Sequence, residues 1–193
     1  THETMRKIRI FEHISLDGVI EHDGDYAYGA WTTAYRSPAG AEMLFQVYGS
    51  DFDLLLGRQT YDIFSGFWPN AGDFPMANAI NAATKYVATH RPDSLTWGPV
   101  KNLEEDIVAA IHALKSMDGP DLIVVGSSTL TSLLLEQGLV DEVVLITYPV
   151  LLGHGKRLLS DKVYAQKLVF LDSKATPTGI FINSYKYNGS LKK

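Results

Sequence analysis

The stretch of sequence that decides the fold is DLIVVGSSTLTSLLLEQGLVDEVVLITY, residues 121–148. It opens with an apolar run at residues 122–125 and closes with another at residues 143–148, and both runs are typical of buried strands. Between them, Ser127 or Ser128 is an N-cap, leucines recur on one helix face, and a glycine ends the helix. A strand, a helix and a strand in succession are typical of a crossover between parallel strands, so this stretch predicts an α/β protein.

The rest of the chain adds strands to the same sheet. Apolar runs at residues 8–14 and 52–56, and a weaker one at residues 85–89, predict three more strands. Residues 167–173 and 180–187 predict two further strands, because the turn-forming sequence Thr-Pro-Thr-Gly joins them. We therefore expect a mostly parallel central sheet that closes with a C-terminal antiparallel hairpin.

Two other helices have clear start signals. Ser37 and the proline after it predict a helix to about Tyr48, because serine caps a helix and proline favours its first turn. Asn102 and Glu105 form the pattern of a capping box, and the Gly-Pro pair at residues 119–120 stops the helix that follows. Helices between the strands are what a crossover architecture requires.

Composition excludes several classes of protein. The chain has 193 residues, 46% apolar and 20% charged, and we expect one domain over residues 5–190. Its net charge of -5 and its scattered Lys and Arg argue against nucleic acid as a partner. No apolar run is long enough to cross a membrane, and there is no cysteine to form a disulfide or bind a metal. These features agree with a cytoplasmic protein without a metal site.

Polar or glycine-rich residues follow four of the predicted strands, where ligands of open α/β sheets bind. The four segments are residues 15–18, 57–61, 89–91 and 126–130. Gly126 and the helix start after it are suited to a diphosphate, although the same residues are also an ordinary loop and N-cap. Arg58 with Thr60 is a second anion site or a solvated turn. His90 and Arg91 are a clamp for a 2′-phosphate or a basic loop before a proline.

The motifs match one family in order. They are ISLDG at residues 14–18, LGRxTY at 56–61, FWP at 67–69, THR at 89–91, VGSSxL at 125–130, GLVDE at 138–142 and PVxLGxGxxL at 149–158. Together they resemble the reductase domain of the bacterial riboflavin-biosynthesis deaminase/reductase, a member of the dihydrofolate-reductase-like superfamily. The resemblance implies a three-layer dihydrofolate-reductase-like α/β fold, NADPH as the cofactor, and a homodimer.

The resemblance also implies roles for individual residues. It assigns the adenosine-side phosphates to Gly57, Arg58 and Thr60, and the 2′-phosphate to Thr89, His90 and Arg91. It assigns the pyrophosphate to Gly126, Ser127, Ser128, Thr129 and Leu130. Asp17 lies near the substrate and the nicotinamide, where it would orient the substrate or relay a proton, with Glu42 as the alternative acid.

The implied activity is NADPH-dependent reduction of a pyrimidine- or pterin-type heterocycle, similar to 5-amino-6-(5-phosphoribosylamino)uracil reductase of riboflavin biosynthesis. The chain differs from the bifunctional protein because it has no deaminase domain with its zinc-binding set, and because Gly126 is followed by serine where many relatives have a second glycine. Two other functions stay open: dihydrofolate reductase activity, and NADP binding without catalysis.

Overall fold

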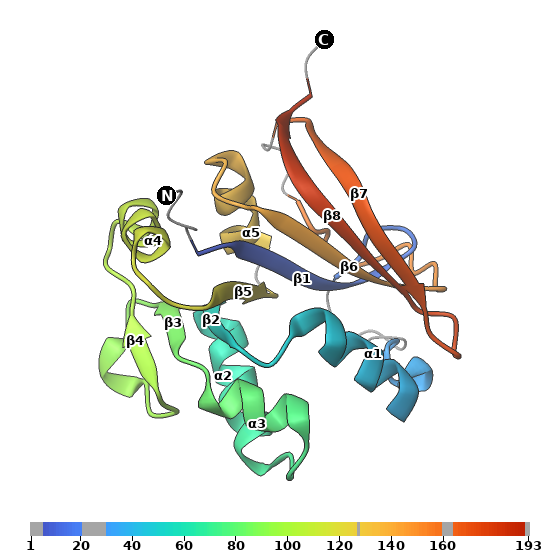
Figure 1. Cartoon of the computed structure of the whole chain (residues 1–193), viewed down its shortest axis with the longest axis horizontal. Coiled ribbons are helices and arrows are strands. Elements are labelled where there is room, and N and C mark those ends of the chain that lie inside the picture. Colours follow the sequence, from blue (N-terminus) through green and yellow to red (C-terminus); the bar gives the residue numbers. More distant parts are fainter. Residues whose placement is uncertain (1–5, 21–29, 127, 160–163, 192–193) are drawn as a thin grey trace.

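The central feature is one eight-stranded sheet, with the strand order β4-β3-β2-β5-β1-β6-β8-β7 (Figure 1). The computed structural model describes residues 6–20, 30–126, 128–159 and 164–191. The strands are β1 Ile8–Ser15, β2 Phe52–Gly57, β3 Lys85–Ala88, β4 Val100–Asn102, β5 Asp121–Val125, β6 Glu142–Tyr148, β7 Gln166–Ala175 and β8 Phe181–Ser190. The α-helices are α1 Pro38–Tyr48, α2 Arg58–Phe67, α3 Pro75–Ala82, α4 Ile107–Ser116 and α5 Ser128–Glu136.

The predicted sheet is confirmed. The ladders from β4 to β6 are all parallel, and β8 and β7 complete the sheet as an antiparallel pair. The turn before β8 closes when Thr176 and Ile180 share a backbone hydrogen bond of 2.8 Å, and Gly179 adopts a φ of 93° that favours glycine. This is the dihydrofolate-reductase-like fold, with a mostly parallel sheet and a C-terminal hairpin.

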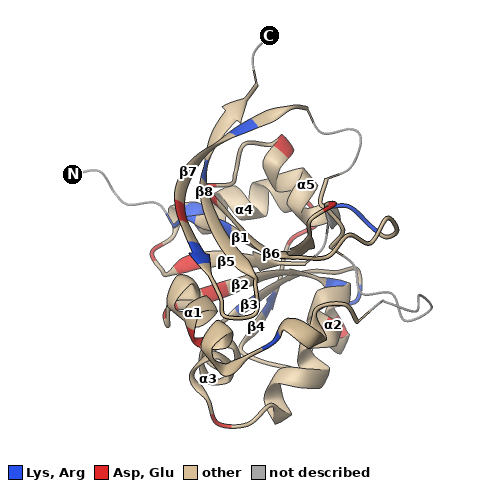
Figure 2. Cartoon of the chain, turned by 90° about the vertical axis from the view of Figure 1, so that its right-hand side faces the viewer, with Lys and Arg blue, Asp and Glu red and all other residues tan. Residues whose placement is uncertain are grey.

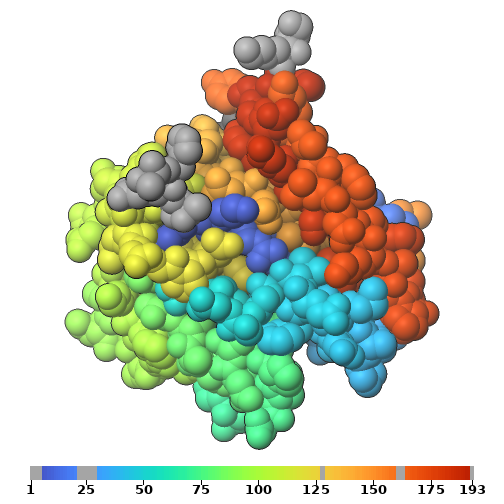
Figure 3. Space-filling model, in the orientation of Figure 1, coloured from blue at the N-terminus to red at the C-terminus, as the bar shows by residue number. Residues whose placement is uncertain are grey.

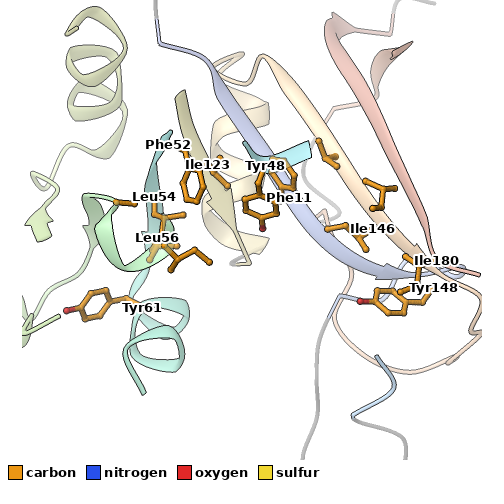
Figure 4. Close-up of a cluster of buried hydrophobic side chains, with 14 of the residues drawn as sticks. Phe11, Tyr48, Phe52, Leu54, Leu56, Tyr61, Ile123, Ile146, Tyr148 and Ile180 are labelled. Carbon is orange, nitrogen blue, oxygen red and sulfur yellow. The ribbon is translucent and has the colours of Figure 1, made fainter. Parts of the chain in front are cut away.

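Helices cover both faces of the sheet and make three layers (Figure 1). On one face, α1, α2 and α3 pack against strand residues such as Phe11, Leu54 and Ile123. Figure 4 shows part of this cluster, in which the rings of Phe11 and Tyr48 have centroids 4.1 Å apart. On the other face, α4 and α5 pack against Ile10 and its neighbours. Burial of each large apolar side chain stabilises the fold by about 1.5–3 kcal/mol, so both faces contribute.

The helix predicted from Asn102 begins later than its sequence pattern indicates. Asn102 ends β4, and α4 begins at Ile107, where the Asp106 side chain accepts a hydrogen bond of 3.1 Å from the Ala109 N–H. The capping-box interpretation was therefore wrong, because pairing with β3 holds residues 100–102 in an extended conformation. The short strand β4 and the helix α3 were not predicted.

The start of α1 agrees with the prediction. The Ser37 hydroxyl accepts a hydrogen bond of 3.0 Å from the Gly40 N–H, and Pro38 occupies the first turn. Within the described residues, no helix is both long and apolar enough to span a bilayer. The same residues contain no cluster of three or more His, Cys, Asp or Glu side chains that could hold a metal ion.

Candidate active site

The candidate site lies at the carboxyl ends of two neighbouring strands whose connections lead to opposite sides of the sheet. β1 and β5 are adjacent and parallel, and the chain leaves β1 through α1 to reach β2 but leaves β5 through α5 to reach β6. Because α1 and α5 cover opposite faces, the carboxyl ends of β1 and β5 form a topological switch point. Ligands of open α/β sheets bind outside such ends. The predicted segments after β1, β2, β3 and β5 all lie at this edge.

Thr60 and Gly126 meet at the ends of β2 and β5. Gly126 has a φ of 67°, and a Cβ on it would lie 2.7 Å from the Thr60 Oγ1. A side chain at position 126 is therefore excluded both by backbone conformation and by contact. Glycine at this position lets the main chain before α5 approach Thr60, and a glycine before a helix start is compatible with diphosphate binding.

Arg58 organises the loop after β3. Its Nε donates to Asp62 at 2.8 Å, and its Nη1 donates to the Thr89 hydroxyl at 3.1 Å and to the Arg91 carbonyl at 2.8 Å. Its Nη2 donates to the Ser94 hydroxyl at 2.7 Å. Because these contacts use most of its donors, the geometry gives Arg58 the role of holding the loop that carries Arg91.

Arg91 and His90 are exposed at the end of this loop. The Arg91 side chain is 66% exposed, and its nearest acid is Asp62, with a distance of 3.6 Å between the charged atoms. A long ion pair at the surface contributes little, so this guanidinium can turn toward an anionic ligand. Lys and Arg are otherwise dispersed over several elements (Figure 2). The structure thus brings Arg58, Thr89 and Arg91 together.

Asp17 ties two loops to each other. Its carboxylate accepts hydrogen bonds from the Ser15 hydroxyl at 2.6 Å, from the Gly153 N–H at 2.6 Å and from the Leu152 N–H at 3.1 Å. These hydrogen bonds, with Ser15 first, hold the pKa of Asp17 well below its usual range. The group is therefore a fixed carboxylate that joins the loop after β1 to the loop after β6.

Close backbone packing continues between these two loops. The Leu16 N–H donates to the Val150 carbonyl at 2.9 Å, and the Ile20 N–H donates to the Lys156 carbonyl at 2.9 Å. Gly155 has a φ of 123°, and a Cβ on it would lie 2.5 Å from a methyl group of Val19. The two glycines of the PVxLGxGxxL motif thus allow the loop after β6 to pack closely against the loop after β1.

The remaining predicted residues are more dispersed. Glu42 is an exposed residue of α1, and the structure does not join it to Asp17. Ser127 lies outside the described residues, as does the side chain of Ser128. Thr129 is exposed, while Leu130 is buried in the core beneath α5. The side chain of Leu130 therefore packs α5 against the sheet.

Glu12 was missed from the sequence. It lies on β1 with 4% of its surface exposed, and its Oε1 has no hydrogen-bond partner within the described residues. Burial raises the pKa of Glu12 from 4.5 to about 8. The available signal was an acidic residue within the apolar run at residues 8–14, a position that is rarely occupied by an unpaired charge.

Aromatic side chains lie on the opposite face of β1. His13 Nδ1 and the Tyr148 hydroxyl share a hydrogen bond of 2.7 Å, and burial raises the pKa of Tyr148 to about 12. The rings of Trp31 and Tyr35 pack edge-on against Tyr148, at centroid distances of 5.2 and 5.9 Å. Phe67 and Trp68 pack edge-on against each other, with ring centroids 5.0 Å apart.

The fold and this edge define an α/β protein of the dihydrofolate-reductase-like class, with polar loops gathered at a switch point. The family model of the RibD C-terminal domain matches residues 6–182. The chain belongs to this family.

Similar proteins cover nearly the whole chain. The uncharacterized protein YyaP of Bacillus subtilis is 24% identical over 188 residues, which span 95% of this chain and 96% of the relative. The crystal structure of a putative riboflavin biosynthesis protein from Shewanella aligns with a TM-score of 0.69 at 21% identity, covering 94% of this chain and 99% of that one.

A bifunctional enzyme aligns over part of its own length. The deaminase/5-amino-6-(5-phosphoribosylamino)uracil reductase of Thermotoga maritima matches with a TM-score of 0.66 at 15% identity. The match covers 95% of this chain but 57% of the Thermotoga protein. At these identities the solved structures support the fold, and the family match supports a reductase-like domain.

Proposed function

We propose that this chain is an NADPH-dependent reductase of a pyrimidine- or pterin-type heterocycle, similar in activity to 5-amino-6-(5-phosphoribosylamino)uracil reductase. The observation that carries the proposal is that the segments predicted to bind anions lie at one sheet edge, around the carboxyl ends of β1 and β5. Membership of the RibD C-terminal domain family supports the same reaction class. A cytoplasmic location fits such an enzyme.

The donor set at this edge suits NADPH. The segment from Gly126 into the first turn of α5, with Gly126 held against Thr60, would bind the pyrophosphate. Gly57, Arg58 and Thr60 would lie along the adenosine side, and Thr89, His90 and Arg91 would bind the 2′-phosphate. When bound, the cofactor supplies the hydride, and the protein supplies alignment and charge.

Asp17 would contribute by orientation. Its carboxylate accepts three hydrogen bonds at or below 3.1 Å, which keep the loops after β1 and β6 in register. A substrate placed between these loops and the nicotinamide would have its reacting carbon held at a fixed distance, which accelerates the reaction. A carboxylate with a lowered pKa is suited to holding a position rather than to donating a proton.

The test measures binding and turnover separately. Calorimetry should give an NADPH affinity in the micromolar range, and NADPH oxidation should be followed with the ribosylaminopyrimidine phosphate of the riboflavin pathway and with dihydrofolate as acceptors. Turnover with the first acceptor supports the proposal, and turnover with dihydrofolate alone assigns the other activity. NADPH binding without oxidation of any acceptor would instead indicate a non-catalytic binding protein.

We propose as well that the protein is a homodimer that uses the surface of β7. This edge strand carries exposed apolar side chains on both of its faces, with Val169 44%, Phe170 62% and Leu171 47% exposed. Figure 3 shows β7 and β8 as an orange and red band along the surface of the molecule. An apolar edge strand of this length is an aggregation risk for a monomer, and a second copy would cover it.

A further inference from the structure

Glu12 occupies a special place on β1. The β1–β5 ladder ends with the pair Phe11 and Val125, so Glu12 is the first residue of β1 beyond it. On its other side Glu12 still pairs with Leu145 of β6. The group therefore lies at the switch point, one strand position past the end of the β1–β5 ladder.

The face of β1 that carries Glu12 is the α5 face. Side chains alternate along a strand, so Glu12 shares its face with Ile8 and Ile10, which pack against α4 and α5. Leu130, in the first turn of α5, belongs to the same cluster. Glu12 thus lies on the side of the sheet where α5 begins, on the same face as the apolar cluster.

Other buried charged groups of the described chain have partners. Arg6 donates to Asp53 at 2.6 Å, and Lys115 donates to Asp141 at 2.7 Å. Lys85 donates to the carbonyls of Asn81 and Gly98. Glu12 Oε1 is the one buried side-chain oxygen or nitrogen in the described residues that has no hydrogen-bond partner. An unpaired buried acid destabilises a protein, so its presence indicates a ligand-binding role.

Electrostatics agree with a neutral carboxylic acid. Burial raises the pKa of Glu12 to about 8, and no cationic partner lowers it. On α1, burial raises the pKa of Tyr48 and the charge of Glu12 raises it further, while Arg9 acts in the opposite direction. The carboxyl group is therefore protonated at neutral pH and can donate.

We propose that Glu12 supplies the proton to the heteroatom of the bond that is reduced at the switch point. The role rests on the proposed reductase function. The substrate carbon accepts a hydride from NADPH, which is oxidised to NADP⁺, and the nitrogen or oxygen of the same C=N or C=O bond takes the proton of the Glu12 carboxyl. The carboxylate that remains regains a proton from water, so electrons and protons balance.

Other candidate donors are less suitable. Asp17 is held as a carboxylate by three hydrogen bonds. Glu42 is exposed on α1. His13 shares its Nδ1 hydrogen bond with Tyr148 on the other face of the strand. Glu12 combines burial, an unpaired oxygen and a position at the ends of β1 and β5.

The first experiment needs no substrate. Infrared difference spectra of the parent protein between pH ~6 and ~10 should show a protonated carboxyl band that titrates near pH 8, as the raised pKa requires. The band should be lost in Glu12→Gln and kept in Glu136→Gln, a matched control because Glu136 is exposed at the end of α5. A parent spectrum without this band would overturn the role of Glu12.

The second experiment measures turnover with NADPH and the ribosylaminopyrimidine phosphate. Glu12→Gln should lower kcat by about a hundredfold or more, with NADPH affinity by calorimetry changed by less than about twofold. The parent kcat/KM should fall about tenfold per pH unit above pH ~8, and Glu12→Asp should restore part of the activity lost in Glu12→Gln.

The outcomes separate this role from the proposed function. A folded Glu12→Gln protein that keeps turnover within a few-fold of the parent overturns the role of Glu12 and leaves the reductase function standing. If the parent oxidises NADPH with neither this acceptor nor dihydrofolate, both the proposed reductase function and the proposed role of Glu12 are rejected. If Glu12→Gln does not fold, the titrating band of the parent and the pH profile of Glu12→Asp decide the matter.

Discussion

The hydroxyl oxygen of Thr60 lies 2.7 Å from the position that a Cβ on Gly126 would occupy. The two residues follow different strands, β2 and β5, which are neighbours in the sheet. Their contact joins the starts of α2 and α5. Any side chain at position 126 would force Thr60 or the main chain before α5 to shift, and this main chain is proposed to hold a diphosphate.

Gly126→Ala is expected to lower both stability and NADPH affinity. The φ of 67° disfavours a residue with a Cβ by about 1–2 kcal/mol, and the contact with Thr60 adds to this cost. Urea unfolding and NADPH calorimetry measure the two effects. Adding Thr60→Ser to Gly126→Ala should not restore stability or affinity, since the backbone strain and the hydroxyl remain. A Cβ at Gly138 would meet no neighbouring atom, so Gly138→Ala should lower stability but leave NADPH affinity unchanged. Unchanged NADPH affinity in Gly126→Ala would contradict the proposed cradle.

Arg91→Ala is expected to reduce the preference for NADPH over NADH. A charge-assisted hydrogen bond to a phosphate contributes about 1.5–3 kcal/mol, so the parent should prefer NADPH by about tenfold or more. Calorimetry with both cofactors measures this preference. Lys7→Ala is the control, because Lys7 lies at the amino end of β1 and pairs with Glu142. If Arg91→Ala keeps the full preference, another residue binds the 2′-phosphate.

Asp17→Asn is expected to lower turnover by about a hundredfold while leaving NADPH affinity nearly unchanged, because a misplaced substrate reacts slowly. Because folding lowers the pKa of Asp17, its stabilising effect is present above its ordinary value of 3.8 and is lost as the pH falls further. The melting temperatures of parent and variant should therefore differ at neutral pH and converge in acid. Ser15→Ala removes one of the three contacts and should have a smaller effect. A lower melting temperature with turnover within a few-fold would leave Asp17 a structural role only.

Glu12 should make the stability of the parent depend on pH. The folded protein keeps the Glu12 proton up to about pH 8, whereas the unfolded chain loses it near 4.5, so raising the pH between these values lowers the free energy of unfolding. At about 1.4 kcal/mol per pKa unit, the loss amounts to a few kcal/mol. In urea unfolding from pH ~5 to ~9, the free energy of unfolding of Glu12→Gln should rise relative to that of the parent as the pH increases. Parallel pH dependences of the two proteins would show that Glu12 is not neutral in the fold.

Phe170→Asp is expected to convert the proposed homodimer into a monomer. A charge on β7 would be desolvated in an interface but tolerated at a free surface, where Phe170 is 62% exposed. Light scattering after size-exclusion chromatography measures the mass. Met117→Asp is the control, because Met117 is also exposed but follows α4, away from the hairpin. A parent that runs as a monomer would refute the proposed dimer.

The local sequence pattern predicted most of the strands of the sheet, but it predicted the start of one helix too early. Residues 121–148 fold into the predicted strand, helix and strand because apolar periodicity and glycine stops act over neighbouring residues. The helix after Asn102 starts late because a neighbouring strand competes for the same backbone groups. The local sequence pattern does not show this competition, because it depends on pairing with a strand from another part of the chain.

The sequence by itself determined the fold class, the positions of seven of the strands along the chain and the loops that follow them, since these depend on residues close together in the chain. Only the tertiary structure decided what individual polar groups do. Asp17 is held by backbone amides at residues 152 and 153, and Arg58 is held by a loop more than thirty residues away. Glu12 is buried on the face of β1 that α5 covers, and its Oε1 has no hydrogen-bond partner within the described residues. Burial and pairing arise from contacts between distant segments, and the ionisation of each acid follows from them.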